Sequence, residues 1–231
     1  MPKPITAAAL LLALAGATAA SAQDAPAGVW DVSVDVGVVS DYRFRGLSLS
    51  GEDPAVQASL VAAHASGWFG EVFVSSIEEY GFGLDGEGAK VEVDYTLGWS
   101  GEVNGFEVQV AASAYTYPGG TDVDYIEFPA EIGRSVGPVT LTVGAAYAPS
   151  QTALGYEDNR YVWTSGEYAL GASNAALFAS VGHEDGAYAP GGKTDWAVGG
   201  RLPIDRVTLG ISYVDSDADE GALIGEIWLS F

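Results

Sequence analysis

The stretch that decides the fold is Lys90 to Trp99, KVEVDYTLGW, in which polar and apolar side chains alternate throughout. One face carries Val91, Val93, Tyr95, Leu97 and Trp99, and the other carries Lys90, Glu92, Asp94, Thr96 and Gly98. Because successive side chains of a β-strand point to opposite faces, this period of two predicts a strand with one apolar and one polar surface.

The same period recurs along the chain and predicts an all-β protein of about twelve strands. The expected strands are residues 30–45, 54–64, 68–78, 89–100, 105–117, 124–134, 139–148, 160–170, 174–183, 194–202, 206–215 and 222–231. Most of them are close to the length of about ten residues that a tilted strand needs to cross a bilayer.

The connections between these strands alternate in length. Short turns are expected near Ser66, Asn104, Gly137, Gly171 and Asp205. The longer connections are residues 47–53, 79–88, 118–123, 149–159, 184–193 and 216–221, all rich in Gly, Pro, Asp or Glu. Short periplasmic turns opposite longer extracellular loops are typical of an antiparallel up-and-down outer-membrane barrel, in which an even strand number places both termini on the periplasmic side.

The N-terminal segment has the features of a secretory signal peptide. Lys3 precedes an apolar run, and Ala20-Ser21-Ala22 matches the small-residue cleavage pattern, so residues 1–22 are predicted to be removed. Residues 23–231 then form a single barrel domain, exported to the outer membrane of a Gram-negative bacterium. They contain no Cys and no apolar run long enough for a membrane helix. The net charge of −22 argues against binding nucleic acid.

A soluble β-sandwich is the competing fold. Its strands would be shorter and its connections would not alternate in length so regularly. A twelve-stranded open sheet would also expose two edges, whereas closure in lipid pairs every backbone group. The sequence therefore favours the closed barrel.

The last strand carries a further signal. Ile227, Leu229 and the terminal Phe231 share one face of an amphipathic strand. A chain that ends in this way resembles the recognition signal of bacterial outer-membrane proteins, which implies that the barrel-assembly machinery and outer-membrane lipids are partners.

Three stretches show a family resemblance. SDYRFRGLS (Ser40 to Ser48), DPAVQASL (Asp53 to Leu60) and HASGWF (His64 to Phe69) resemble the TorF-type porin family, bacterial proteins described as of unknown function. The C-terminal segment from Ser212 is similar too, while the middle of the chain is not. The resemblance implies an outer-membrane barrel and a pore, and it implies neither catalytic residues nor a substrate.

Catalysis and metal binding are both weakly indicated. His64 and His183 are expected at opposite ends of the barrel, and the chain has no Gly-x-Ser-x-Gly motif, so we expect no catalytic site and no cofactor. Asp215, Asp217 and Asp219 have the spacing of a calcium loop. Glu220 stands where that loop requires Gly, so we expect an acidic loop and no metal site.

The lumen is the expected functional region, because charged side chains cannot face lipid cheaply. The parity of each strand predicts the inward bases Arg43, Arg45, Lys90 and Arg201. It also predicts the inward acids Asp31, Asp35, Asp41, Glu71, Glu92, Asp94, Glu107, Glu127, Glu131, Glu167, Asp195 and Glu226. In this reading Arg43 and Arg45 continue the first strand on the lumen wall, while Tyr42 and Phe44 reach the membrane interface outside.

Two interiors are open to a barrel of this size. Eight strands are filled by side chains and about sixteen leave a channel, so twelve predict a narrow aqueous pore or a plugged barrel. The acidic excess favours passive diffusion of small hydrophilic solutes that are cationic or neutral. The alternative is a non-conducting outer-membrane scaffold whose loops bind a partner. Monomer and homo-oligomer are both compatible with the sequence.

Overall fold

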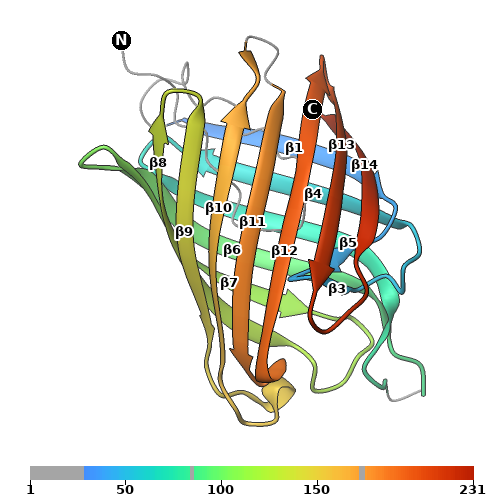
Figure 1. The fold of residues 1–231 in the computed structure, drawn as a ribbon. Coiled ribbons are helices and arrows are strands. Elements are labelled where there is room, and N and C mark those ends of the chain that lie inside the picture. The colour runs from blue at the N-terminus through green and yellow to red at the C-terminus, as the bar shows by residue number, and fades with distance from the viewer. Residues whose placement is uncertain (1–28, 84–85, 172–174) are drawn as a thin grey trace.

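Twelve antiparallel strands close into one barrel in the part of the chain that the computed structural model describes, residues 29–83, 86–171 and 175–231 (Figure 1). The predicted signal peptide, residues 1–22, lies outside the described residues. The barrel strands are β1 (Trp30–Val39), β4 (Ala55–His64), β5 (Trp68–Tyr80), β6 (Ala89–Val103), β7 (Phe106–Thr116), β8 (Tyr125–Val136), β9 (Val139–Ala148), β10 (Asn159–Ala169), β11 (Ala176–Gly186), β12 (Ala189–Ile204), β13 (Val207–Ser216) and β14 (Ala222–Ser230).

The predicted up-and-down topology is confirmed. Each barrel strand pairs with the next barrel strand along the chain, and β1 closes the ring between β4 and β14. The closing register places Val36 opposite Leu229, and Phe231 donates its backbone N–H to the carbonyl of Val34 at 2.9 Å. The barrel strands therefore leave no unpaired sheet edge.

The two surfaces of the sheet differ in chemistry as the alternation predicts. Large apolar side chains stand exposed on the outer surface, for example Leu97 at 63 % and Ile227 at 58 % of their full exposure. The alternate positions point into the barrel and are largely buried, among them Asp94 and Glu226. No helix in the described ranges is long and apolar enough to cross a membrane.

The two ends of the barrel also differ. The terminal end, where β1 begins and β14 ends, has turns such as residues 104–105 and 205–206. The opposite, loop end carries the long connections 40–54, 81–88, 117–124, 149–158 and 217–221. The connection between β10 and β9 at this end includes a single 3₁₀ turn, η1 (Thr152–Leu154).

The prediction of a long loop over residues 184–193 is wrong. Strand β11 continues to Gly186 and β12 begins at Ala189, so only two residues turn the chain. Gly186, Gly191 and Gly192, whose backbones have φ values of 125°, 93° and 86°, absorb an irregular register without ending the strands. Composition alone suggested a loop, because Gly and Pro are common to loops and to such irregular hairpin tips.

The prediction that the first strand continues to residue 45 is also wrong. Strand β1 ends at Val39, and Ser40 makes the last backbone hydrogen bond with β14, donating its N–H to the carbonyl of Gly225 at 2.9 Å. Beyond it, β2 (Arg43–Phe44) and β3 (Leu47–Ser48) form a small sheet of their own. We call residues 40–53 the inner hairpin.

Inward-pointing aromatic rings lie against glycines of neighbouring strands. A Cβ atom on Gly144 would come within 2.1 Å of Trp163, and one on Gly182 within 2.0 Å of Tyr161. Flat contact of a large ring on a glycine covers backbone that has no side chain of its own. The rings thereby lie along the barrel wall on β9 to β11.

Candidate functional site

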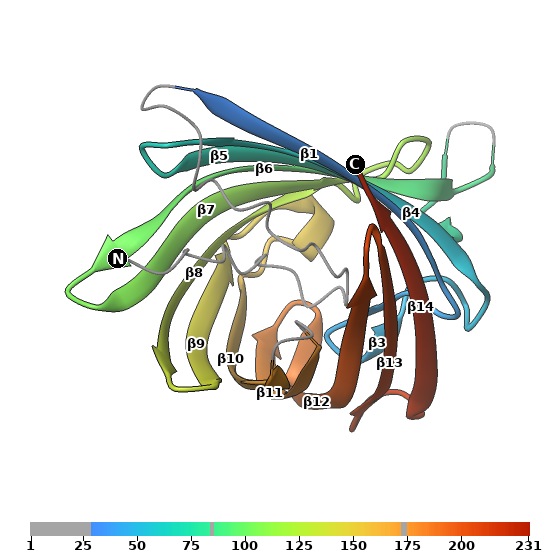
Figure 2. The same cartoon turned by 90° about the horizontal axis from the view of Figure 1, so that it is seen from above.

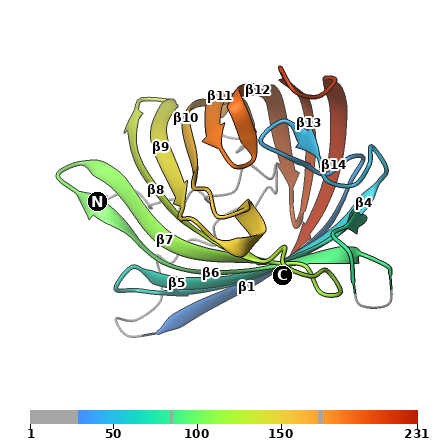
Figure 3. The same ribbon diagram turned by 90° about the horizontal axis from the view of Figure 1, so that it is seen from below.

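The inner hairpin lies within the ring of strands, near the loop end. Figures 2 and 3, which view the barrel from its two ends, show β3 inside the ring, and Figure 3 also shows η1 at the mouth. Tyr42 packs with the inward-facing Phe73 of β5 and Trp228 of β14, and Phe44 packs on Tyr115 of β7. The hairpin thus contacts several sides of the barrel wall.

Arg45 and Gly46 form the tip of the hairpin. Their φ values of 49° and 82° are both positive, as a two-residue turn between antiparallel strands requires. A Cβ atom on Gly46 would come within 2.6 Å of the Ser216 Cβ and 2.9 Å of the Asp195 Cβ. Only glycine fits at this point between the tip and the wall.

Arg45 is the centre of a buried ionic network. Its guanidinium donates to Glu127 of β8 at 2.6 Å and to Glu184 of β11 at 2.7 Å. Lys193 of β12 lies 2.8 Å from Glu184 and donates to the Arg45 carbonyl at 2.7 Å. The Arg45 guanidinium also stacks 4.2 Å above the ring of Tyr161. Three strands are therefore tied to the tip of one hairpin.

Arg45 stays charged in this site. Its burial opposes the charged form, but the carboxylates of Glu127 and Glu184 prevail and raise its pKa well above the ordinary value. Arg45, Glu127 and Glu184 are all buried. Two carboxylates around one guanidinium, with Lys193 on the second carboxylate, give a closely balanced group of charges.

Arg43 anchors the base of the hairpin. It donates to the side chain of Asp41 at 2.6 Å and to the carbonyl of Glu220 at 2.6 Å. Asp219 lies 3.6 Å from the same guanidinium and accepts from the Ser48 N–H at 3.0 Å. The acidic connection of residues 217–221 thus holds the inner hairpin.

The aspartates of the acidic loop bind backbone groups of the protein. Within residues 29–83, 86–171 and 175–231, no cluster of three or more His, Cys, Asp or Glu could hold a metal ion. Asp217 instead accepts a backbone hydrogen bond from Thr194 at 2.9 Å, and Asp215 accepts one from Ser216 at 2.8 Å. The aspartates that have the spacing of a calcium loop therefore hold the backbone of this region.

A group of aromatic side chains surrounds the hairpin tip. Tyr115 and Tyr125 stack with ring centroids 4.6 Å apart, and Tyr188 meets Tyr125 edge-on at 5.3 Å. Leu154 of η1 packs into the same group. The interior at this level consists of rings and paired charges.

The predicted inward acids fall into two groups. Seven are buried: Asp35, Asp41, Glu92, Asp94, Glu127, Asp195 and Glu226. Five are half-buried: Asp31, Glu71, Glu107, Glu131 and Glu167. Arg201 pairs with Glu167 in the second group. Arg43 and Arg45 are buried on the inner hairpin and not on a strand of the barrel.

Three other predictions about side chains can be compared with the structure. Lys90 does not face the lumen: it is exposed and pairs with Glu79 and Glu87. His64 ends β4 at the terminal end, while His183 lies near the loop end of β11, so the two are separated as expected. Tyr42 and Phe44 do not reach the outer surface, because the hairpin turns inward.

Glu184 and Lys193 are the members of the network that the sequence reading missed. Composition predicts a loop for both residues, although the alternation indicates that they point inward. Phe178 and Gly182 show which alternate positions of β11 point into the barrel. Glu184, two residues after Gly182, is the next such position. On β12, Asp195 points into the barrel, so Lys193, two residues before it, is expected to do so too. Extending each alternation past the glycines would have placed both side chains inside.

The assembly-signal residues share the outer surface. Phe231, Ile227 and Leu229 are exposed at 62 %, 58 % and 38 %, while Trp228 between them is buried inside the barrel. Their role in assembly stays a prediction.

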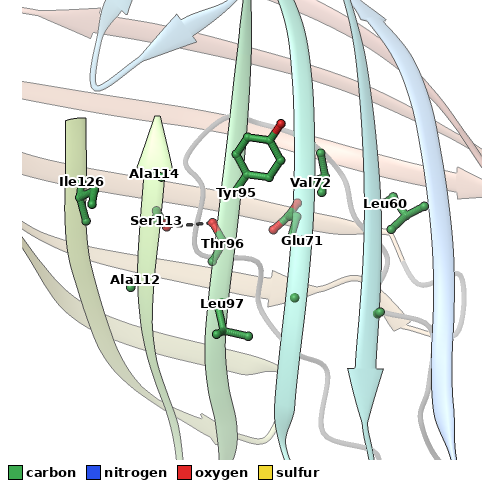
Figure 4. A pocket seen from close by; sticks show the side chains of 12 residues that line it. Leu60, Glu71, Val72, Tyr95, Thr96, Leu97, Ala112, Ser113, Ala114 and Ile126 are labelled. Carbon is green, nitrogen blue, oxygen red and sulfur yellow. Dashed lines mark hydrogen bonds between the residues drawn. The ribbon is translucent and has the colours of Figure 1, made fainter. Parts of the chain in front are cut away.

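One hollow of about 440 Å³ lies on the outer surface across β4 to β8 (Figure 4). Leu60, Tyr95, Leu97 and Ile126 stand exposed around it, and the small residues Ala62, Gly70, Ala112 and Ala114 form its floor. The hollow is apolar and lies on the other side of the barrel wall from the charged network.

Comparison with solved structures shows the same kind of fold. The structure titled "KdgM porin in complex with disordered oligogalacturonate" has a TM-score of 0.59 at 8 % identity, over 88 % of this chain and 99 % of that one. The NanC porin has a TM-score of 0.56 at 10 % identity, over 87 % and 99 %. The COG4313 outer membrane channel from Pseudomonas putida F1 has a TM-score of 0.50 at 11 % identity, over 90 % and 97 %.

No curated protein matches the sequence. A family model matches residues 23–227, almost the whole predicted barrel domain. The chain therefore belongs to the Gcw_chp family, described as bacterial proteins of unknown function.

Proposed function

We propose that this protein is a porin-like channel in the outer membrane of a Gram-negative bacterium, and that small cations and neutral hydrophilic solutes diffuse through it. The observation that carries the proposal is a closed barrel that is apolar outside and charged inside. In lipid, the charged side chains of a barrel must face the interior, which either contains water or pairs every charge with an opposite one. The similarity of its fold to outer-membrane porins supports this use of the barrel.

An excess of carboxylates supports the preference for cations. Among the described residues, eight buried carboxylates stand against three buried basic side chains. The acids are Asp35, Asp41, Glu92, Asp94, Glu127, Glu184, Asp195 and Glu226, and the bases are Arg43, Arg45 and Lys193. A lumen with net negative charge raises the local concentration of cations.

The inner hairpin would set the narrowest part of the path. It lies within the ring of strands and is held at two separate points, by Arg43 at the carbonyl of Glu220 and by Arg45 at Glu127. Solutes would pass beside it, between the ion pairs and the aromatic side chains around Tyr115. In this role Arg43 and Arg45 belong to the constriction itself.

Reconstitution into planar bilayers tests the proposal. We expect single-channel conductance and, in a salt gradient, a reversal potential of the sign that marks cation preference. Absence of conductance from protein that shows the heat-modifiable gel shift of a folded barrel would overturn the channel. An anion-selective reversal potential would keep the channel and overturn the preference.

A non-conducting scaffold is the second candidate, and the burial of the network favours it. Glu127 and Glu184 are only 1 % and 2 % exposed, as in a closed interior. The scaffold predicts no conductance in the wild type and a large conductance after the inner hairpin is shortened. The channel predicts conductance in both proteins.

Insertion into the outer membrane would depend on the C-terminal strand. We propose that the barrel-assembly machinery recognises the exposed face of Ile227, Leu229 and Phe231. Deletion of Phe231 should reduce the amount of folded protein in outer-membrane fractions. Phe82, which is exposed in a loop-end connection, offers a control when changed to alanine.

A further inference from the structure

Two carboxylates of β6 lie together on the inner wall under the inner hairpin. Glu92 and Asp94 are two residues apart on one strand, so both point into the barrel. Each is 2 % exposed. Ser75 lies opposite Glu92 on β5, and Tyr115 lies opposite Asp94 on β7.

These carboxylates lack the partners that the other buried acids have. The Tyr117 hydroxyl donates to Glu92 Oε1 at 2.9 Å. In the described part of the chain, Glu92 Oε2 and both carboxylate oxygens of Asp94 have no hydrogen-bond partner. Asp41, by contrast, pairs with Arg43, and Glu127 pairs with Arg45. A buried carboxylate without a partner is costly unless something neutralises it.

Among the residues that the structure describes, no basic side chain pairs with Glu92 or Asp94. The charged groups that act on Asp94 are Glu92 and Glu71, both acidic. Arg45 is held by Glu127 and Glu184, and Arg43 by Asp41. The residues opposite the pair on the neighbouring strands are Ser75, Phe73 and Tyr115, all of them uncharged.

Tyr42 of the inner hairpin lies over the pair. It is buried, and its ring centroid lies 6.0 Å from that of Phe73, which is opposite Asp94 on β5. Its phenol offers a neutral oxygen to whatever lies between the carboxylates. Tyr117 contributes a second such oxygen.

We propose that Glu92 and Asp94 bind one hard divalent cation of the calcium class inside the barrel. Three unpartnered carboxylate oxygens supply the charge, and hydroxyls and water complete the shell. Ca²⁺ accepts oxygen ligands in a flexible geometry, which suits a site with only two carboxylates. Two negative charges in a poorly solvated place match a charge of +2. The inference rests on the proposed function only in that the lumen must admit cations.

Terbium luminescence in detergent-solubilised, folded protein tests the site without any need for conductance. Tb³⁺ bound between Glu92 and Asp94 is close enough to Tyr42 and Tyr117 to be excited through their rings. We expect a luminescence signal that Ca²⁺ displaces. Asp94→Asn and Glu92→Gln should each weaken Ca²⁺ competition by roughly tenfold or more.

Asp205→Asn is the matched control, because it makes the same change in an exposed turn at the terminal end. It should leave the displacement curve unchanged. Unchanged binding in folded Asp94→Asn and Glu92→Gln would overturn the site, and so would a wild type that shows no Ca²⁺-displaceable signal at neutral pH. If Asp94→Asn fails to fold, Glu92→Gln decides alone. Bound Tb³⁺ in a protein that does not conduct would support the site and reject the channel.

Discussion

The guanidinium of Arg45 lies 2.6 Å from the carboxylate of Glu127, although 82 positions separate the two residues in the chain. A second carboxylate, that of Glu184, approaches the same guanidinium from another strand at 2.7 Å. One side chain at the tip of the inner hairpin thus ties β8 and β11 together through the interior of the barrel. The ion pairs form only when the hairpin turns inward.

Replacing Arg45 by methionine should release the hairpin. The change keeps most of the side-chain volume but leaves Glu127 and Glu184 with an uncompensated buried charge. We expect the free energy of unfolding to fall by roughly 3 kcal/mol or more. We also expect single-channel conductance to rise. Urea titration in detergent and bilayer recording measure the two effects.

Arg160→Met is the control for this change. Arg160 pairs with Asp158 at 2.7 Å, as Arg45 pairs with its acids, but its side chain is 64 % exposed. Exposed pairs contribute little, so stability and conductance should not change measurably. Equal effects of the two substitutions would contradict the assignment of Arg45 as the centre of the network.

Gly46→Ala should force the hairpin tip away from the wall. The added methyl would meet the Cβ atoms of Ser216 and Asp195 below 3 Å, and the backbone has φ 82°. Overpacking and backbone strain together should lower the free energy of unfolding by about 2–3 kcal/mol. Chemical denaturation measures the change.

Gly105→Ala isolates the backbone part of this effect. Gly105 has a nearly identical φ of 81°, but a Cβ there meets nothing within 4 Å. Its cost should be about 1 kcal/mol, with unaltered conductance. If the two alanine variants behave alike, the close fit of the tip against β12 and β13 does not matter.

Gly144→Ala should disturb the barrel wall. A Cβ at this position would overlap the ring of Trp163 at 2.1 Å, so the ring or the strand must shift. We expect a loss of about 1–3 kcal/mol and a change in Trp fluorescence. Gly225→Ala, in β14 with nothing within 4 Å of its Cβ, should cost nothing measurable. A harmless Gly144→Ala would contradict the contact.

Alkaline pH should weaken the packing of the hairpin through Tyr42. Its folded-state pKa is raised above the ordinary value of 10.0 by burial and by Glu92 and Asp94. The folded state therefore holds the phenolic proton where the unfolded state releases it. The stability that Tyr42 contributes is complete below pH 10 and declines as the pH rises further.

Tyr42→Phe should make stability fall less steeply above pH 10. The measurement is the urea midpoint between pH 8 and about 11. Tyr156→Phe, a change in an exposed loop, should leave the slope as in the wild type. An identical slope in Tyr42→Phe would show that this phenol does not contribute.

The alternation of side chains predicted most of the barrel. Residues 139–148 were predicted as a strand with the bounds that β9 has, and the other strands agree to within a few residues except at two places. Both misjudged places, residues 40–45 and 184–193, contribute to the buried network. A period of two shows which side chains share a face, but it cannot show where a strand leaves the sheet or where glycines are absorbed within one.

The sequence by itself therefore determined the closed antiparallel barrel, its apolar outer surface and the side of the wall that most charged residues of the barrel strands occupy. These features follow from local alternation and from the need to pair every strand edge. Only the tertiary structure decided that residues 40–53 fold into the lumen, that Arg45 meets Glu127 and Glu184, and that Asp94 stays without a partner. Such contacts join residues far apart in the chain, and their energies depend on burial and on distances that no local pattern encodes.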